Sequence, residues 1–320
     1  MEIIMGKEPE YNNPLVYQRA DPYCYKHTDG YYYFTASVPQ YDLIEIRRAK
    51  TLNYLEHADA KIIWKKHFTG RMGSHIWAPE LHYIDGAWYI YFAAGDAEEV
   101  WNIRPYALVC HDENPMKGRW KECGMIDVGE ESFSLDMTTF VHKGQRYNLW
   151  AHTTSELPYS SVYIAKFKNA LERESEPMLL TTPEYEWEKR GIWVNEGPAV
   201  LIRNGKIFVT YSAANTGANY CMGLMWCYEN DDPMDINSWH KSEEPVFKTS
   251  VENSQYGPGH NSFTTDGEHD IMLYHARSYE RIKGDPLHDP NRHARAMVIK
   301  YDENGFPIFG EPRADTWKDE

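Results

Sequence analysis

The sequence is short of positive charge and of long apolar runs. It contains 33 Lys and Arg residues against 48 Asp and Glu residues in 320, so its formal net charge is −15. Nucleic acids and anionic lipid surfaces attract basic patches, so this balance argues against either as a partner. No apolar run approaches the roughly 20 residues that cross a bilayer. Hydrophobic residues at 42% still suffice for a sizeable core, which excludes a disordered chain.

Cysteine is also scarce, and two familiar motifs are missing. The five cysteines are an odd number without a Cys-x-x-Cys pair, which favours reduced thiols over a disulfide framework. Residues 1–8 contain no basic segment followed by an apolar core, as a secretory signal would. These observations predict a cytoplasmic protein. No Gly-rich phosphate loop is found, so we expect no nucleotide or redox cofactor to be required.

Aromatic residues, in contrast, are abundant. They make up 14% of the chain and include 24 Tyr and 11 Trp. Rings that combine a flat apolar face with a polar edge suit β-strands and also suit contacts to sugar rings. Composition alone favours the first of these interpretations, a β-rich core.

One strand–turn–strand pattern recurs five times. Asp-Gly and Asn-Gly between strand-forming residues are strong hairpin signals. The predicted turns are Asp29-Gly30, Asp85-Gly86, Lys143-Gly144, Asn204-Gly205 and Asp266-Gly267. A third apolar stretch follows each hairpin, and a fourth element recurs around Trp64, Trp120, Trp187, Trp239 and Trp317.

Four strands per unit, repeated at a period of about 60 residues, predict the fold. It is all-β, a five-bladed β-propeller with four-stranded antiparallel blades. One blade cannot bury both of its faces, so the blades must stack around a common axis. We expect residues 1–320 to form this propeller as a single domain.

The residue that opens each repeat should face the central channel, because the innermost strands converge there. The aligned residues are Asp21, Ala78, Asp136, Glu196 and His260, at successive spacings of 57, 58, 60 and 64 residues. Three carboxylates in a narrow, water-poor channel repel one another, which raises the pKa of at least one. Glycoside hydrolysis needs such a set, with one protonated acid and one ionised base across the glycosidic bond.

The local motifs around these residues resemble those of glycoside hydrolase family 43. They are Ala20-Asp21-Pro22-Tyr23, Trp77-Ala78-Pro79-Glu80, Ser134-Leu135-Asp136, Asn195-Glu196-Gly197-Pro198, Gly259-His260 and Tyr274-His275-Ala276-Arg277. The resemblance extends over essentially the whole chain. It implies a five-bladed propeller and an inverting mechanism, in agreement with the repeats.

The resemblance also implies roles for the three carboxylates. Asp21 would be the general base that activates water, and Glu196 the general acid that protonates the leaving oxygen. Asp136 would orient the acid and tune its pKa. An inverting reaction separates base and acid by about 6.5–9.5 Å, which leaves room for the attacking water.

Four further residues are predicted to bind substrate: Trp77, Ala78, His260 and Arg277. Trp77 would offer a flat face to the sugar. By the resemblance, Arg277 would hold both Asp136 and sugar hydroxyls with its fork of donors. Trp101 and Tyr220 lie in longer loops that could wall subsites.

His260 has three interpretations. It could bond a sugar hydroxyl, ligate an axial calcium or other ion together with waters, or be a core histidine with satisfied hydrogen bonds. A lone imidazole is a poor calcium site, because calcium prefers about six to eight oxygen ligands.

The implied activity is that of an exo-acting α-L-arabinofuranosidase, which releases terminal arabinofuranose from arabino-oligosaccharides or arabinan-type side chains. β-Xylosidase is the nearest alternative, since xylopyranose and arabinofuranose present similar hydroxyl spacing. An endo-arabinanase would need an open cleft, and transfer to phosphate would need a basic cluster. A propeller that only binds sugars would need none of the three acids. In each interpretation the partner is a carbohydrate.

Overall fold

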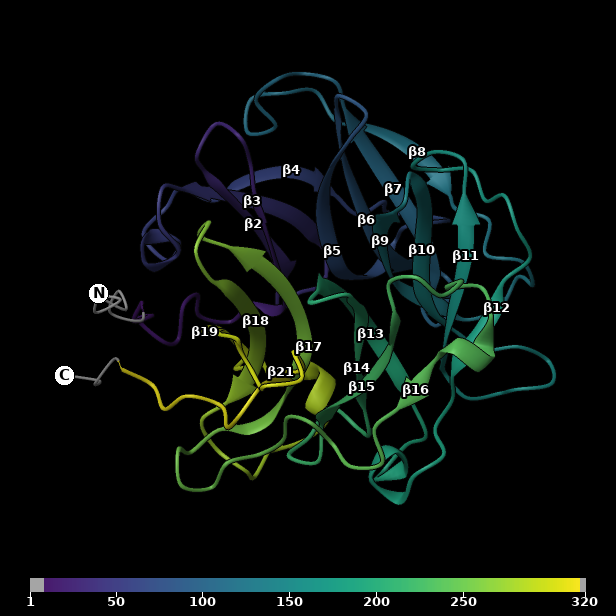
Figure 1. The fold of residues 1–320 in the computed structure, drawn as a ribbon. Coiled ribbons are helices and arrows are strands. Elements are labelled where there is room, and N and C mark those ends of the chain that lie inside the picture. Colours follow the sequence, from purple (N-terminus) through teal and green to yellow (C-terminus); the bar gives the residue numbers. More distant parts are fainter. Residues whose placement is uncertain (1–8, 317–320) are drawn as a thin grey trace.

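The computed structural model describes residues 9–316 and contains five antiparallel sheets of three or four strands around one axis (Figure 1). This confirms the all-β, five-bladed propeller. Blade one contains β1 (Ala20–Lys26), β2 (Tyr32–Ser37), β3 (Leu43–Ala49) and β4 (Lys61–Lys65). Blade two contains β5 (Ser74–Ile84), β6 (Ala87–Gly95), β7 (Arg104–Cys110) and β8 (Lys121–Met125).

The remaining blades follow in chain order, each beginning with its innermost strand. Blade three contains β9 (Ser134–His142), β10 (Gln145–His152), β11 (Ser161–Phe167) and β12 (Met178–Thr181). Blade four contains β13 (Asn195–Arg203), β14 (Lys206–Ala213), β15 (Cys221–Tyr228) and β16 (His240–Lys241). Blade five contains β17 (Tyr256–Thr265), β18 (Asp270–Arg277) and β19 (His293–Val298).

The other regular elements of residues 9–316 are short. They are η1 (Leu52–Tyr54), η2 (Glu186–Lys189), η3 (Ile236–Ser238), η4 (Pro286–His288) and the pair β20 (Lys300–Tyr301) and β21 (Pro307–Ile308). Within this described range, no helix has the length and apolar character needed to span a membrane.

The predicted hairpin turns lie between the first two strands of every blade. In Asp85-Gly86, Lys143-Gly144 and Asn204-Gly205 both residues have positive φ, the geometry of two-residue turns that match the twist of the flanking strands. In blades one and five the strands are joined by longer loops, in which only Gly30 and Gly267 have positive φ.

The tryptophan-centred fourth elements are less regular than predicted. Trp64 lies in β4, whereas Trp120 and Trp239 lie just before a fourth strand. Trp187 lies in η2, after β12 has ended, so it is not part of a strand. Trp317 lies outside the described residues.

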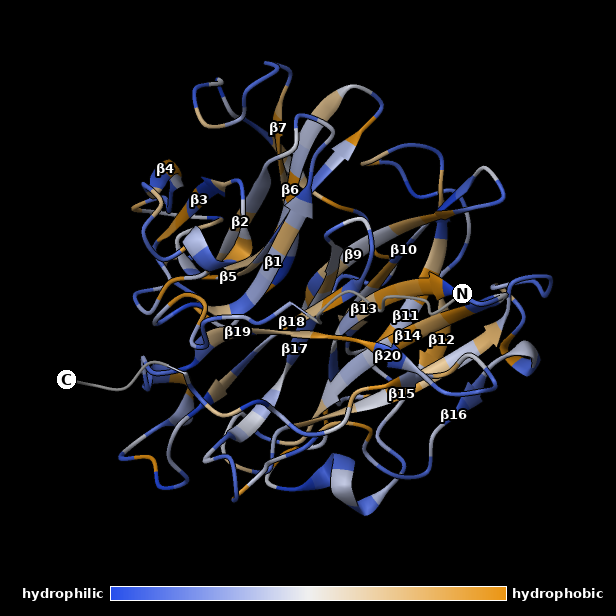
Figure 2. Ribbon diagram, turned by 60° about the vertical axis from the view of Figure 1, so that its left-hand side comes forward, coloured by the Kyte–Doolittle hydropathy of each residue, from blue (hydrophilic) through white to orange (hydrophobic). Residues whose placement is uncertain are grey.

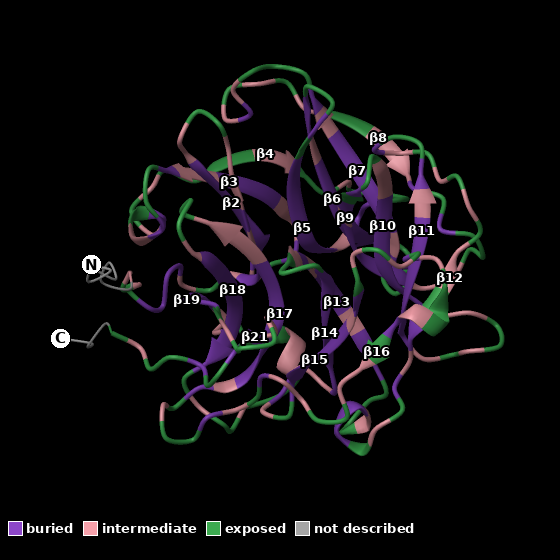
Figure 3. Ribbon diagram, in the orientation of Figure 1, coloured by how far each residue is buried: buried purple, intermediate pink, exposed green. Residues whose placement is uncertain are grey.

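Apolar surface joins each blade to the next. Five buried clusters lie one at each blade–blade interface, so every sheet packs on both neighbours. Figure 2 shows hydrophobic residues concentrated along the strands, and Figure 3 shows the inner strands of the blades buried, whereas the outer strands β4 and β8 are exposed or intermediate. The propeller therefore has a continuous core in the form of a ring.

The ring closes where the N-terminal segment meets blade five. Leu15 N donates to Ala294 O at 2.7 Å, and Ala294 N donates to Val16 O at 2.9 Å. The Asn13 side chain pairs with both backbone groups of Ala296, at 3.0 Å and 2.9 Å. The segment before β1 thus takes the fourth-strand position beside β19, so blade five differs from the expected continuous four-stranded sheet.

A β-bulge interrupts the innermost strand of every blade near the axis. One residue of each bulge has a left-handed backbone: Asp21 (φ 53°), Ala78 (φ 44°), Asp136 (φ 57°), Gly197 (φ 54°) and His260 (φ 44°). The spacings are therefore 57, 58, 61 and 63 residues. This corrects the sequence alignment in blade four, where Gly197 holds the equivalent position and Glu196 precedes it.

The closure generates a stability prediction. Replacing Asn13 with Ala leaves the N–H and C=O of Ala296 without their side-chain partners in a buried position. We expect a loss of about 2–4 kcal/mol in the free energy of unfolding, measured by guanidinium denaturation followed by circular dichroism. The exposed Asn304→Ala is the matched control. Equal stability of the two variants would contradict this account of ring closure.

Candidate active site

A cavity of about 300 Å³ opens at the axis, and five of the seven predicted site residues line it. They are Asp21, Trp77, Asp136, Glu196 and His260. Its wall also includes Trp101, Ile192, Leu287 and Arg292. The cavity therefore brings together predicted residues from all five blades, while Ala78 and Arg277 lie outside the lining.

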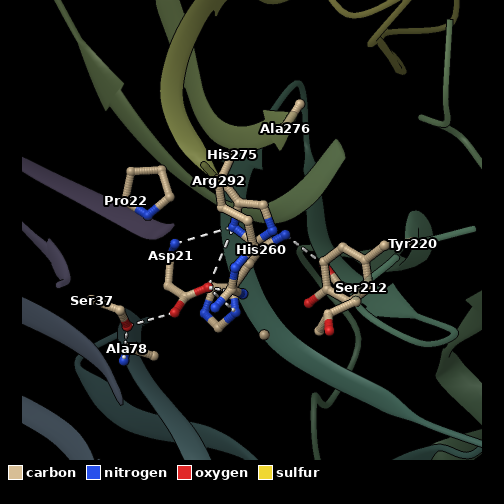
Figure 4. Close-up of polar contacts among 12 residues, drawn as sticks. Asp21, Pro22, Ser37, Ala78, Ser212, Tyr220, His260, His275, Ala276 and Arg292 are labelled. Carbon is tan, nitrogen blue, oxygen red and sulfur yellow. Dashed lines mark hydrogen bonds and ion pairs between the residues drawn. The ribbon is translucent and has the colours of Figure 1, made fainter. Parts of the chain in front are cut away.

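Asp21 is held through both carboxylate oxygens (Figure 4). Ser37 Oγ donates to Asp21 Oδ2 at 2.5 Å. Asp21 Oδ1 lies 3.3 Å from Nδ1 of His260, 3.3 Å from Nδ1 of His275 and 3.6 Å from Nη1 of Arg292. The carboxylate is thus fixed between one hydroxyl of its own blade and three nitrogen-bearing side chains of blade five.

These neighbours decide the protonation state of Asp21. Burial raises the pKa of the carboxyl, but the charges of His260 and Arg292 lower it by more. His275, whose Nδ1 accepts a hydrogen bond from Asp21 N at 3.1 Å, adds to this lowering. The net result is a pKa well below the usual range for aspartate. Asp21 is therefore an ionised carboxylate at neutral pH and can accept a proton from water.

The pKa values of Glu196 and Asp136 are shifted in the opposite direction, upwards. Burial raises the pKa of Glu196, and the Tyr220 hydroxyl, which donates to Glu196 Oε1 at 2.7 Å, opposes this only in part. Burial and the negative charges of Glu196 and Asp21 raise the pKa of Asp136, although Gly197 N donates to Asp136 Oδ2 at 2.9 Å. The cavity thus combines an ionised carboxylate with two carboxyls that favour protonation.

His260 lies between the carboxylates. Its Nδ1 is 3.3 Å from Asp21 Oδ1 and 4.0 Å from Asp136 Oδ2, and its backbone N donates to Ser212 Oγ at 2.7 Å. Burial lowers the pKa of the imidazole, but the charges of Asp21, Asp136 and Glu196 outweigh burial and raise it. His260 therefore favours the cationic form, which neutralises part of the acidic cluster.

An axial ion bound by His260 finds little support in the protein groups around it. Among residues 9–316, no group of three or more His, Cys, Asp or Glu side chains is arranged to hold a metal. Calcium prefers about six to eight oxygen ligands, which waters would have to supply here. Residues 9–316 therefore contain no metal site made of protein ligands alone.

Arg277 requires a correction. Its Nε lies 3.0 Å from Asp289 Oδ1, and its two terminal nitrogens donate to the carbonyls of Thr216 and Pro286 at 2.6 and 2.7 Å. With all three nitrogens engaged there, it braces the loop around η4 rather than holding Asp136. The guanidinium beside the carboxylates belongs to Arg292.

Ala78 acts through its backbone. Its N–H donates to Ser37 Oγ at 2.8 Å, and the same hydroxyl donates to Asp21. Ala78 therefore supports the site from behind the cavity wall instead of contacting a ligand.

The sequence did not predict the roles of four residues of the site: Ser37, Tyr220, His275 and Arg292. His275 lies within a motif already singled out, and Tyr220 was expected to wall a subsite rather than to bond Glu196. Ser37 ends β2 opposite the first bulge, since it pairs with Ala20. Arg292 lies in the irregular segment before β19, outside the repeat, so alignment of the blades could not find it.

Comparison with known proteins gives consistent matches. The family model described as "Glycosyl hydrolases family 43" matches residues 11–307. The chain is 51% identical over 308 residues to a Streptomyces avermitilis protein named extracellular exo-α-(1→5)-L-arabinofuranosidase, covering 95% of this chain and 64% of that relative. A Streptomyces chartreusis protein of the same name is 49% identical over 279 residues, covering 86% of this chain and 85% of that relative.

A solved structure matches equally well. The crystal structure of α-L-arabinofuranosidase from Lactobacillus brevis shares 50% identity with the chain at a TM-score of 0.93, and the match covers 96% of this chain and 98% of that one. The chain nevertheless spans less than two thirds of the length of the Streptomyces avermitilis relative, 64%.

The prediction of a cytoplasmic protein is contradicted, because both Streptomyces relatives are named extracellular. The cysteine argument failed for a physical reason. Cys24, Cys110, Cys221 and Cys227 are buried in the blade–blade clusters, where a thiol packs as a small apolar group whatever the surrounding redox conditions.

The family model covers most of the chain, the relatives are about half identical, and the propeller carries the three carboxylates in one cavity. This chain belongs to glycosyl hydrolases family 43.

Proposed function

We propose that the protein is an exo-acting, inverting α-L-arabinofuranosidase. It releases terminal α-L-arabinofuranosyl residues from arabino-oligosaccharides or arabinan-type side chains. The observation that carries the proposal is that Asp21 and Glu196 line one cavity, where their surroundings shift the two pKa values in opposite directions. The names of the two Streptomyces relatives and of the Lactobacillus brevis structure support the arabinoside over the xyloside.

The proposed reaction is a single displacement. Asp21 removes a proton from a water molecule, whose oxygen attacks the anomeric carbon. Glu196 gives its proton to the glycosidic oxygen as the carbon–oxygen bond breaks, so the leaving sugar departs as an alcohol. Because Tyr220 donates to Glu196 Oε1, Oε2 is the oxygen left free to carry the proton. Asp136 fixes the adjacent backbone through Gly197 N.

The size of the cavity supports exo action. About 300 Å³ is at the lower end of the range for ligand pockets, which suits a terminal sugar and its neighbour better than a long polymer. Protein groups from blades one, two, three, four and five surround it, as a pocket for a chain end requires.

Substitution of the two carboxylates tests the proposal. Replacing Asp21 or Glu196 with Ala should lower kcat/KM on 4-nitrophenyl α-L-arabinofuranoside by about 10²–10⁴, because each removes one proton transfer. Wild-type activity on 4-nitrophenyl β-D-xylopyranoside should be much lower. The exposed Glu303→Ala should behave as wild type. A variant of either carboxylate with ordinary turnover would refute its assignment.

The leaving group distinguishes the acid from the base. A 2,4-dinitrophenolate needs little protonation, so Glu196→Ala should recover much of its activity on the 2,4-dinitrophenyl arabinofuranoside. Asp21→Ala should recover none, because water activation is still missing. The same response from both variants would contradict the division of roles.

Tyr220 provides a pH prediction. Its hydrogen bond stabilises the carboxylate form of Glu196, so Tyr220→Phe should raise the pKa of that carboxyl further. Since the acid must be protonated, the alkaline limb of the kcat/KM profile should move to higher pH. The exposed Tyr228→Phe serves as control. An alkaline limb that stays in place or moves to lower pH would show that the hydrogen bond does not tune the acid.

A further inference from the structure

Three aromatic rings form a ladder that runs outward from the cavity. The ring centroid of His75 lies 4.5 Å from that of Trp77 and 4.8 Å from that of Trp101, with interplanar angles of 45° and 35°. Trp77 is only 8% exposed, whereas Trp101 is 56% exposed. Both tryptophans line the same cavity as Glu196. The ladder thus leads from the carboxylates to the rim.

Trp101 is presented by a loop that is braced rather than loose. His75 Nδ1 donates to Val100 O at 2.7 Å, and Ser74 Oγ donates to Asp96 O at 2.9 Å. A Cβ added at Gly95 would lie 2.1 Å from Val100 O, so the loop is packed against the end of β6. The exposure of Trp101 is therefore a fixed feature of the rim.

His75 holds an unusual backbone to make this contact. Its φ is 47°, in the left-handed region that costs energy for a residue other than glycine. Its side chain makes the hydrogen bond to the loop carbonyl and also fills the space between the two tryptophans. His75 thus holds the loop through its hydrogen bond and orients the Trp101 indole through its ring.

The reaction itself supplies an occupant for the rim. Glu196 protonates the oxygen that joins the terminal sugar to the next one, so the next sugar must lie in the outer part of this cavity. A fixed, half-exposed indole face there offers the flat apolar surface that stacks on a sugar ring.

We propose that Trp77, His75 and Trp101 form a leaving-group subsite for an arabino-oligosaccharide, in which Trp101 stacks on the second sugar ring. His75 is the positioning residue that holds Trp101 in place. This inference rests on the proposed function and adds to it a preference for a sugar over a small alcohol as leaving group.

The test compares two substrates that differ only in the leaving group. Arabinobiose carries a second sugar ring and methyl α-L-arabinofuranoside does not, and neither leaving group is aromatic. We expect Trp101→Ala to lower the ratio of their kcat/KM values, arabinobiose over methyl glycoside, by about tenfold. Trp101→Phe should restore most of the ratio, and Tyr228→Ala, which removes an exposed ring elsewhere, should leave it unchanged.

His75→Asn isolates the positioning role. Asparagine tolerates a left-handed backbone and can donate to Val100 O, so this variant removes the stacked ring and keeps the brace. The ratio should fall here too, with the melting temperature near that of the wild type. An unchanged ratio in Trp101→Ala would overturn the subsite, and an unchanged ratio in His75→Asn would overturn the role of His75. Wild-type enzyme that cleaves neither substrate would instead refute the proposed function.

Discussion

The site depends on one electrostatic arrangement, a buried aspartate kept ionised by side chains from the far end of the chain. Asp21 belongs to blade one, whereas His260, His275 and Arg292 belong to blade five or the segment before its last strand. The base is therefore assembled only when the first and last blades meet. The contacts of Asn13 with Ala296, which close the ring, are in this sense also contacts that build the active site.

The same narrow channel imposes an opposite state on Glu196 and Asp136. Burial disfavours the ionised form of every carboxyl, and the positive charges of His260 and Arg292 stabilise the ionised form of Asp21 most. The first ionised group makes ionisation of the others harder, so one cavity supplies both a base and an acid. Hydrophobic residues at these positions would give a more stable propeller. Burial of apolar surface at the five blade–blade interfaces offsets the destabilisation caused by the carboxylates.

The propeller fold and the three carboxylates of the site could be predicted from the sequence, because the hairpin turns and strand patterns are local signals repeated five times. The alignment placed blade four one residue too early, because it followed the polar residue that opens each repeat. The feature that the five bulges share is a left-handed backbone, which glycine at position 197 adopts more easily than glutamate would. Arg292 could not be found by repeat alignment, because an irregular loop delivers it. Arg277, which is the last residue of a recognisable motif, instead supports that loop.

The most direct test of the account is a titration of the three carboxyls by ¹³C NMR, with Asp21→Asn, Asp136→Asn and Glu196→Gln used to assign the signals. The account predicts that Asp21 titrates below the usual range for aspartate, while Glu196 and Asp136 titrate above theirs. If Asp21 held its proton to a higher pH than Glu196, the assignment of base and acid would be reversed and the account would be wrong.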